Sequence, residues 1–341
     1  MSTFFIIAIL VLGFLITFQI AKASEYVSVL RGEEKTIKQN NRINAFLLLG
    51  FLIVGMIGVY YCNEILKGRI LGESASLQGE KIDTMLYITI ALTGVVFVIT
   101  QIILFWFAFK YQHSDKRKAF YYPHNNKLEL IWTIVPAIAL TILVGFGLFY
   151  WFQITSDAPK NAMVVEVTGK QFSWEFRYPG KDGILGKKYF KKVNDATGNP
   201  LGQLWEDAAN HDDIYTTQEV HIVVGKPIHL VINAKDVIHD VGLVHFRMKM
   251  DAVPGTPTTM WFTPKFTTKE MKEKHGEEFE YEISCDQMCG KGHYSMKGIV
   301  KVETQQEFDR WLASKKPQYL VANPDKDPST KVLAEVQKQA K

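Results

Sequence analysis

The chain has 341 residues, of which 47% are hydrophobic, and its formal net charge is +4 at neutral pH. This length allows two or three domains. The charge is modest and spread along the chain, so the composition gives no indication of a nucleic-acid partner. The three cysteines, Cys62, Cys285 and Cys289, are too few for a fold stapled by disulfides.

Nearly all the long apolar runs precede residue 155, and the charged residues concentrate after it. A helix needs roughly 20 residues to cross a hydrocarbon core of about 30 Å. Four segments approach or exceed this length, and we expect each to be a transmembrane helix because lipid offers no partners to free backbone groups. They are residues 3–20, 43–62, 84–109 and 128–152. The first could instead be a cleaved signal peptide, although no basic residue precedes it.

Basic side chains concentrate in two of the linkers between these segments, residues 21–42 and 110–127, whereas the linker at 63–83 is mixed in charge. Cytoplasmic loops carry an excess of Lys and Arg. Four crossings then place both the N-terminus and everything after residue 152 outside the cytoplasm. The sequence therefore predicts a multi-pass protein of a bacterial plasma membrane whose C-terminal half is extracytoplasmic.

From residue 163 the pattern changes to short alternating runs rich in Val, Ile, Phe and Tyr, which are punctuated by Gly and Pro. Many short strands with turns between them are typical of a Greek-key sandwich or barrel. We expect strands at residues 163–168, 171–178, 219–224, 228–233, 241–248, 258–263, 279–284 and 298–302.

The predicted fold class is therefore a set of α-helical transmembrane segments followed by an all-β Greek-key domain. An N-terminal helix pair with a cytoplasmic linker occupies residues 1–62, and a helical hairpin occupies residues 63–155. The β domain covers residues 156–304, with a polar surface insertion at 179–217. Residues 305–341 complete the chain: we expect a short helix at 305–311, and a tail beyond 315 that is loose or packed on a partner.

Two thiols, an imidazole and a thioether lie close together after the last but one predicted strand: Cys285, Cys289, His293 and Met296. Soft sulfur ligands combined with imidazole select copper, whereas zinc prefers Cys, His and carboxylate. A second imidazole should come from a distant strand end. His239 fits this position best, and we rank His245 below it.

The number of cysteines separates the possible copper sites. A blue-copper site uses one Cys, two His and a weak axial Met. Two thiolates in one loop can instead bridge two copper ions, and charge shared between two metals favours fast one-electron transfer. The alternatives for the cysteine pair are a disulfide of an exported domain or a zinc site. No Cys-x-x-Cys-His sequence occurs, so the chain carries no covalent c-type haem and needs a separate electron donor.

At these residues, and over roughly residues 84–303, the sequence resembles subunit II of the haem-copper cytochrome c oxidases. The resemblance implies a transmembrane hairpin followed by a cupredoxin domain that holds a two-copper centre called CuA. The two cysteines would bridge both ions, and Gln287 would contribute its main-chain carbonyl. The implied copper ligands are His239, Cys285, Gln287, Cys289, His293 and Met296.

Other residues follow this family pattern or depart from it. Glu129 resembles a carboxylate at the cytoplasmic mouth of a proton pathway, but an acid at a helix N-terminus is also stabilised by the helix dipole. Phe172 replaces a Trp that often accepts the electron, two residues before Trp174. Gln287 replaces a Glu that often helps to hold magnesium, for which an amide is a weaker ligand. Asp251 matches an acid near the docking face for the donor.

The resemblance implies a relay: electrons would pass from cytochrome c, or from a haem-bearing partner complex, through the copper centre to haem in subunit I. Oxygen would become water there, with proton pumping. The implied partners are subunit I, the other oxidase subunits, the electron donor and the lipid bilayer. The alternatives are the CuA-bearing subunit of a membrane nitric oxide reductase, a metal-free quinol oxidase subunit II, and nitrous oxide reductase, which is soluble.

Overall fold

The computed structural model describes residues 3–67, 71–114 and 116–328. It divides into two compact units. One unit consists of Met1–Leu71 with Ile88–Ile138, and the other of Gly72–Tyr87 with Ala139–Lys341.

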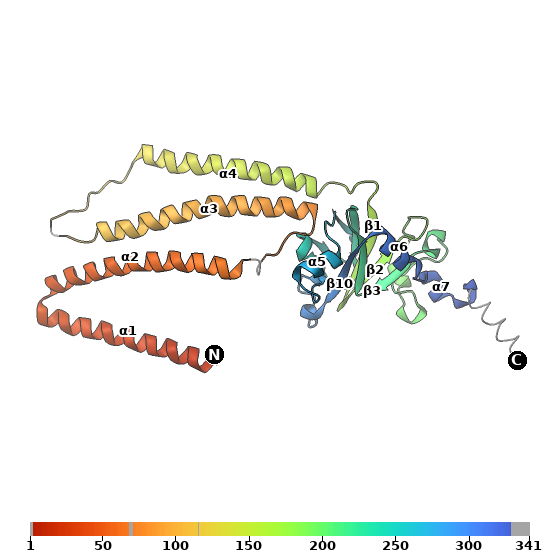
Figure 1. The fold of residues 1–341 in the computed structure, drawn as a ribbon, viewed down its shortest axis with the longest axis horizontal. Coiled ribbons are helices and arrows are strands. Elements are labelled where there is room, and N and C mark those ends of the chain that lie inside the picture. Colours follow the sequence, from red (N-terminus) through yellow and green to blue (C-terminus); the bar gives the residue numbers. More distant parts are fainter. Residues whose placement is uncertain (1–2, 68–70, 115, 329–341) are drawn as a thin grey trace. The chain divides into compact units, whose positions relative to one another are not determined.

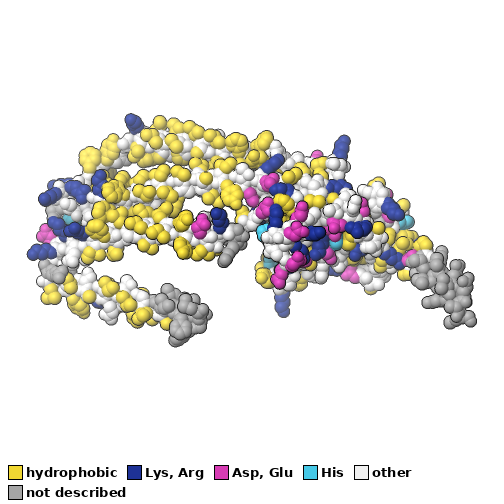
Figure 2. All heavy atoms as spheres, viewed as in Figure 1, with side chains coloured by type: hydrophobic (Ala, Val, Ile, Leu, Met, Phe, Trp, Pro, Cys, Tyr) yellow, Lys and Arg dark blue, Asp and Glu magenta, His cyan; other side chains and the backbone are white. Residues whose placement is uncertain are grey.

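Four long helices precede the β domain: α1 (Thr3–Arg31), α2 (Glu33–Leu66), α3 (Leu77–Lys110) and α4 (Asn126–Ile154). Within the described residues, α2, α3 and α4 are long and apolar enough to cross a membrane. Their apolar side chains are exposed (Figure 2), which is stable in lipid and not in water.

Three of the predicted spans lie inside α2, α3 and α4, as expected. The segment predicted at residues 3–20 belongs to α1, which is helical but is not one of those three spans. Residues 1–2 lie outside the described part of the chain.

The β domain is a sandwich of two five-stranded sheets (Figure 1). The first has the order β3 (Ile214–Thr217), β2 (Ser173–Tyr178), β1 (Met163–Lys170), β5 (Ile228–Ala234) and β8 (Thr258–Phe262). The second has the order β4 (Glu219–Val223), β10 (Lys297–Glu303), β9 (Tyr281–Cys285), β6 (His239–Leu243) and β7 (Met248–Ala252).

The connectivity is that of a Greek-key fold and not of a meander. β1 pairs in parallel with β5, and β4 pairs in parallel with β10, so each pair joins strands that are distant in the sequence. Side chains such as Trp174, Phe176, Ile232 and Tyr281 fill the space between the sheets and are buried. The predicted fold class, transmembrane helices followed by a cupredoxin-like β domain, is therefore confirmed.

The strand predicted at residues 241–248 was wrong in its second half. β6 ends at Leu243, a tight turn follows, and β7 begins at Met248. Arg247 closes the turn with a left-handed φ of 58°, and its Nε donates to Asp83 Oδ1 at 2.9 Å. The ion pair between Arg247 and Asp83, which are far apart in the sequence, cannot be predicted from the pattern of apolar residues. That pattern continues through the turn.

One helix of the β domain was also missed, α5 (Thr268–His275). The side chains of Thr267 and Glu270 form a reciprocal capping box at its start. A Ser or Thr followed three residues later by Glu is a helix-start signal, so the sequence did carry a cue for α5.

The insertion at residues 179–217 is not only a surface feature. It contributes strand β3 and four buried polar residues, Asn199, Gln203, Asn210 and Asp213. Asp213 and Glu166 both bind the buried guanidinium of Arg177, at 2.9 and 2.6 Å. A polar sequence therefore forms a buried, hydrogen-bonded cluster here.

The C-terminal helix is confirmed as α6 (Gln305–Ala313), and the chain up to residue 328 is not a loose tail, whereas packing on a partner stays a prediction. α7 (Gln318–Ala322) packs on the insertion of the same chain. The Gln318 amide donates to the Asp213 carbonyl at 2.9 Å, and its Nε2 donates to the Gly198 carbonyl at 2.7 Å. Residues 329–341 lie outside the described part.

Candidate metal centre

Two neighbouring strands bring the predicted ligands together. β9 ends at Cys285 and pairs with β6, which begins at His239. The loop after β9 returns to β10 at Lys297, and the Cys285 amide donates to the Met296 carbonyl at 3.1 Å to close it. Five of the six predicted ligand residues therefore lie in this closed loop or at its ends. The sixth, His239, is the first residue of β6.

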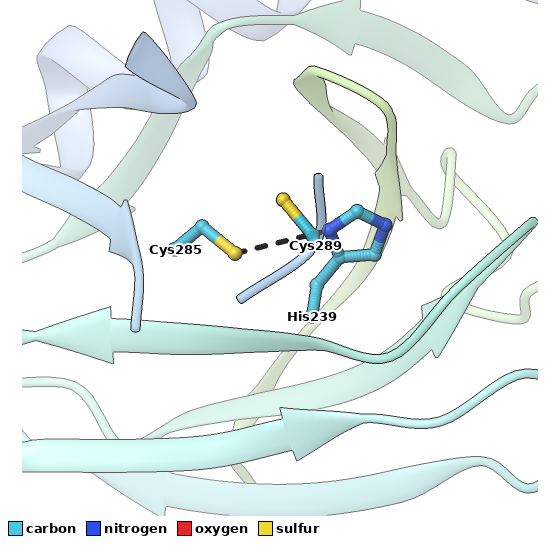
Figure 3. A group of neighbouring side chains, drawn as sticks. All are labelled: His239, Cys285 and Cys289. Carbon is cyan, nitrogen blue, oxygen red and sulfur yellow. Dashed lines mark hydrogen bonds between the residues drawn. The ribbon is translucent and has the colours of Figure 1, made fainter. Parts of the chain in front are cut away.

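The side chains of Cys285 and Cys289 in this loop and of His239 on β6 lie together (Figure 3). Cys285 Sγ lies 3.8 Å from His239 Nδ1 and 3.2 Å from the Gln287 carbonyl oxygen. Cys289 Sγ lies 3.7 Å from His293 Nδ1 and 3.8 Å from Met296 Sδ. The ligand atoms of His239, Cys285 and Cys289 all lie within 4.8 Å of one another, a group that could hold a metal ion.

The chemistry of these donors fits copper. Two thiols, two imidazole nitrogens and a thioether form a soft set, and the one oxygen donor facing it is a main-chain carbonyl. Both cysteines are free thiols, so the structure does not support the alternative of a disulfide. His245 instead packs its ring on Phe279 and Tyr281 and is not part of the group.

A carboxylate orients the buried His239. Its Nε2 lies 2.8 Å from Asp236 Oδ1, so the proton sits on Nε2 and the lone pair on Nδ1 faces Cys285. Burial alone would raise the pKa of Asp236, but hydrogen bonds from the Gln171 amide and from His239 lower this pKa overall. Asp236 is therefore an anion at neutral pH, which favours the metal-binding tautomer.

Gln171 connects this carboxylate to the metal loop. Its amide donates to Asp236 Oδ2 at 2.8 Å, and its side-chain Nε2 donates to the Cys289 carbonyl at 2.6 Å. Sequence reasoning missed both Gln171 and Asp236. The spacing of Asp236 from His239 was a signal for an orienting carboxylate, whereas nothing in the sequence indicated the partner of Gln171.

Burial, together with the neighbouring Cys285, raises the pKa of the Cys289 thiol to about 11. Without a metal this group is a neutral thiol at pH 7. Because metals bind the thiolate, loading the site must release protons. We expect a pH indicator in weak buffer to record acidification when copper is added, and a chain with both cysteines alkylated should not show it.

Phe172 and Trp174 both lie beside the candidate metal centre. The sequence predicted that electrons enter in this region. The Phe172 ring is 38% exposed and lies over the glycines of the metal loop. Trp174 is fully buried, and its ring meets that of His239 edge to face at a centroid distance of 6.1 Å. Their positions suit electron transfer, and their role stays a prediction.

The contact between Phe172 and the loop leaves room only for glycine. A Cβ on Gly292 would lie 2.5 Å from Phe172 Cγ. We expect Gly292→Ala to cost about 1–3 kcal/mol of stability through overpacking, measured by thermal unfolding of the full chain in detergent. Adding Phe172→Ala should recover most of this loss, because it removes the clash. Independent, additive losses in the double variant would contradict this account.

Glu129 lies in the first turns of α4, where its Oε1 accepts a hydrogen bond from the Asn125 amide at 3.2 Å. The Asn125 side chain in turn accepts one from the Leu128 amide at 3.0 Å. These two bonds cap the helix, which is the structural alternative to a proton-pathway role. Asp251 is exposed on β7.

Comparison with known proteins identifies similar chains. The transmembrane domain of cytochrome c oxidase subunit II matches residues 69–150, and its periplasmic domain matches residues 163–303. The alternative cytochrome c oxidase subunit 2 of Bradyrhizobium diazoefficiens is 32% identical over 69% of this chain and 80% of its own. Cytochrome c oxidase subunit 2 of Cereibacter sphaeroides is 27% identical over 66% of this chain and 73% of its own. A solved structure, the periplasmic domain of subunit II of the Bradyrhizobium japonicum cytochrome oxidase, is 21% identical over 48% of this chain and 99% of its own, with a TM-score of 0.34.

Proposed function

The chain belongs to the cytochrome c oxidase subunit II family, and on this premise we propose that it relays electrons from a donor protein to the catalytic subunit through a two-copper centre. The observation that carries the proposal is the convergence of two thiols, two imidazoles, a thioether and a main-chain carbonyl in one closed loop. A quinol oxidase subunit without metal would have no need of these donors.

Two copper ions bound in this loop would supply a site that accepts and passes on one electron at a time. Cys285 and Cys289, as thiolates, would hold the ions together with His239, His293 and Met296. Gln287 would contribute its main-chain oxygen. Its side chain has no part in this role, so a Gln at this position in place of Glu leaves the copper role intact.

The surrounding residues hold the metal-ligand side chains in fixed positions. Asp236 keeps the proton of His239 on Nε2, and Gln171 ties that carboxylate to the loop. Cys285 and Cys289 are nearly inaccessible to water. A rigid, dry site needs little rearrangement when its charge changes, and this suits a relay. A donor protein would approach on the side of the partly exposed Phe172, and the buried Trp174 lies against His239.

The chain is a membrane protein with an extracytoplasmic β domain. Within the proposal, α1 also crosses the bacterial plasma membrane, so that the N-terminus lies outside with the β domain. The donor is cytochrome c or a haem-bearing partner complex. The acceptor is haem in subunit I, where oxygen is reduced to water and protons are pumped.

Metal analysis and electron paramagnetic resonance (EPR) of the copper-loaded full chain in detergent test the proposal. We expect two coppers per chain and a seven-line mixed-valence signal. One copper per chain with a blue-copper spectrum would reject the proposal.

Glu129→Gln separates the two interpretations of this acid. If Glu129 admits protons to the catalytic subunit, the assembled oxidase should turn over more slowly with unchanged copper content. Since Gln can still accept the Asn125 hydrogen bond through its amide oxygen, the helix cap should survive. Unchanged oxygen consumption would leave capping as the role of Glu129.

A further inference from the structure

A pocket of about 850 Å³ lies in the second compact unit, beside the linker that joins α4 to the β domain. Its walls come from the first turns of α3, the last turns of α4 and strands β5, β7 and β8. Ligand pockets typically measure about 300–1,000 Å³, so this one suits a sizeable ligand. None of the six predicted copper ligands lines it.

The pocket lies where the helices leave the membrane. α3 has 34 residues and α4 has 29, and both exceed the roughly 20 residues that the hydrocarbon core requires. The ends that line the pocket are those joined to the extracytoplasmic domain, and they carry Tyr150 and Trp151. Tyr and Trp are enriched at the level of the lipid headgroups. A ligand here would therefore meet water at one end and acyl chains at the other.

Lys81 lines the pocket with a cationic side chain whose hydrogen-bond partner is a neutral amide. Its Nζ donates to Gln153 Oε1 at 2.8 Å and lies 6.0 Å from the centre of the Tyr150 ring. Throughout the described ranges, no carboxylate forms an ion pair with Lys81. The other two cations in the wall differ, since Arg247 is paired with Asp83 and Lys249 with Asp240.

The remaining walls are mainly apolar and held in place. Ile82, Met85 and Ile154 line the side formed by the helices. Trp261 Nε1 donates to the Ser156 carbonyl at 2.8 Å, which fixes the linker after α4 against β8. An anionic group on an apolar body is therefore the best match: the charge would meet Lys81, and the body would cover the helix side chains.

One carboxylate, Asp157, also lines the pocket, close to His229. Burial lowers the pKa of His229, so this ring is neutral at pH 7 and adds no positive charge. A free phosphate with two negative charges would meet only one unpaired cation and this nearby carboxylate. A phosphodiester carries a single charge, and its acyl chains would gain contact with the apolar wall.

We propose that this pocket binds one phospholipid of the outer leaflet, with its phosphodiester at Lys81 and its acyl chains along Ile82, Met85 and Ile154. The ligand would fill the space between the helix ends and the β domain. The proposal is independent of the copper centre and of the electron-transfer role.

Native mass spectrometry of the full chain in detergent tests the lipid site. Phosphatidylglycerol, phosphatidylethanolamine and inorganic phosphate are added separately. We expect the wild type to retain one molecule of either lipid and no free phosphate. Lys81→Ala should weaken lipid retention about tenfold, as expected for the loss of a charge-assisted hydrogen bond. Lys160→Ala is the control, because Lys160 is exposed in the linker after α4 but does not line the pocket.

A second pair of variants fills the pocket without touching a charge. Gly145 and Gly147 both lie in α4, and a Cβ on either would meet nothing within 4 Å, but only Gly147 lines the pocket. Gly147→Trp should abolish lipid retention, and Gly145→Trp should preserve it. An unchanged copper EPR signal in all four variants would show that the β domain is folded.

Three results would overturn the proposal. The first is equal lipid retention in Lys81→Ala and Lys160→Ala. The second is retention of inorganic phosphate in place of lipid. The third comes from the assembled oxidase: a photo-crosslinker at residue 154 that captures polypeptide and no lipid would show that a neighbouring subunit covers the pocket.

Discussion

Cys289→Ser is expected to abolish the two-copper EPR signal of the full chain and, with it, the oxidation of the electron donor by the assembled oxidase. Cys289 Sγ faces both His293 and Met296, so this one sulfur connects two further donors. Substitutions in the outer shell of metal sites already cost 10–100-fold in metal affinity, and we expect the loss of a bridging thiolate to exceed about 100-fold. Metal analysis and EPR of membranes measure the effect.

Cys62→Ser provides the matched control, because it makes the same chemical change at an exposed thiol in α2. It should leave the copper content and the turnover unchanged. Membrane insertion should be normal in both variants, since neither change alters the apolar helices. Full donor oxidation by Cys289→Ser would show that the assignment of this residue is wrong.

Arg177→Met is expected to destabilise the β domain by about 3–5 kcal/mol, the cost of leaving buried charges without their partner. Burial opposes ionisation of Glu166, yet Arg177 and Lys188 hold the pKa of Glu166 below its ordinary value. Burial raises the pKa of Asp213 to about 6, although Arg177 opposes this shift. Removing the guanidinium therefore leaves the buried Asp213 without its cationic partner and leaves Glu166 with Lys188 alone.

The measurement for Arg177→Met is the unfolding of the full chain in detergent, followed through tryptophan fluorescence, to which the buried Trp174 contributes. Lys297→Met is the control: Lys297 also binds a carboxylate, that of Glu282 at 3.2 Å, but both side chains are half exposed. Exposed pairs contribute at most about 1 kcal/mol, so this variant should unfold almost as the wild type does. Equal losses in the two variants would contradict a special role for the buried cluster.

The candidate metal ligands could be predicted because most of them lie in one loop. Cys285, Cys289, His293 and Met296 are held together by the short closed segment between β9 and β10. Asp236 could have been found from its spacing to His239, but the contact of Gln171 could not, because Gln171 and Asp236 are 65 residues apart in the sequence. The spacing of residues within a short segment indicates the chemistry of that segment. A contact between distant segments produces no recognisable pattern in the sequence.

The insertion was misjudged for a different reason. Its polar composition is typical of a surface loop, yet Gln203, Asn210 and Asp213 are buried around Arg177. Polar side chains can be buried at low cost when each finds a partner. No hydrophobic pattern marks such a cluster, so the sequence could not distinguish it from a solvated loop.

The parallel pairing of β4 with β10 sets the order of events during biogenesis. His239 and the metal loop both lie between these two strands in the chain, so the pocket for the ions does not exist until β10 has been exported and has docked. Pairing between such distant segments is slow compared with local structure. If the loop binds copper as proposed, copper delivery would follow export and folding, and a cellular copper donor would recognise a completed sandwich and not an emerging polypeptide.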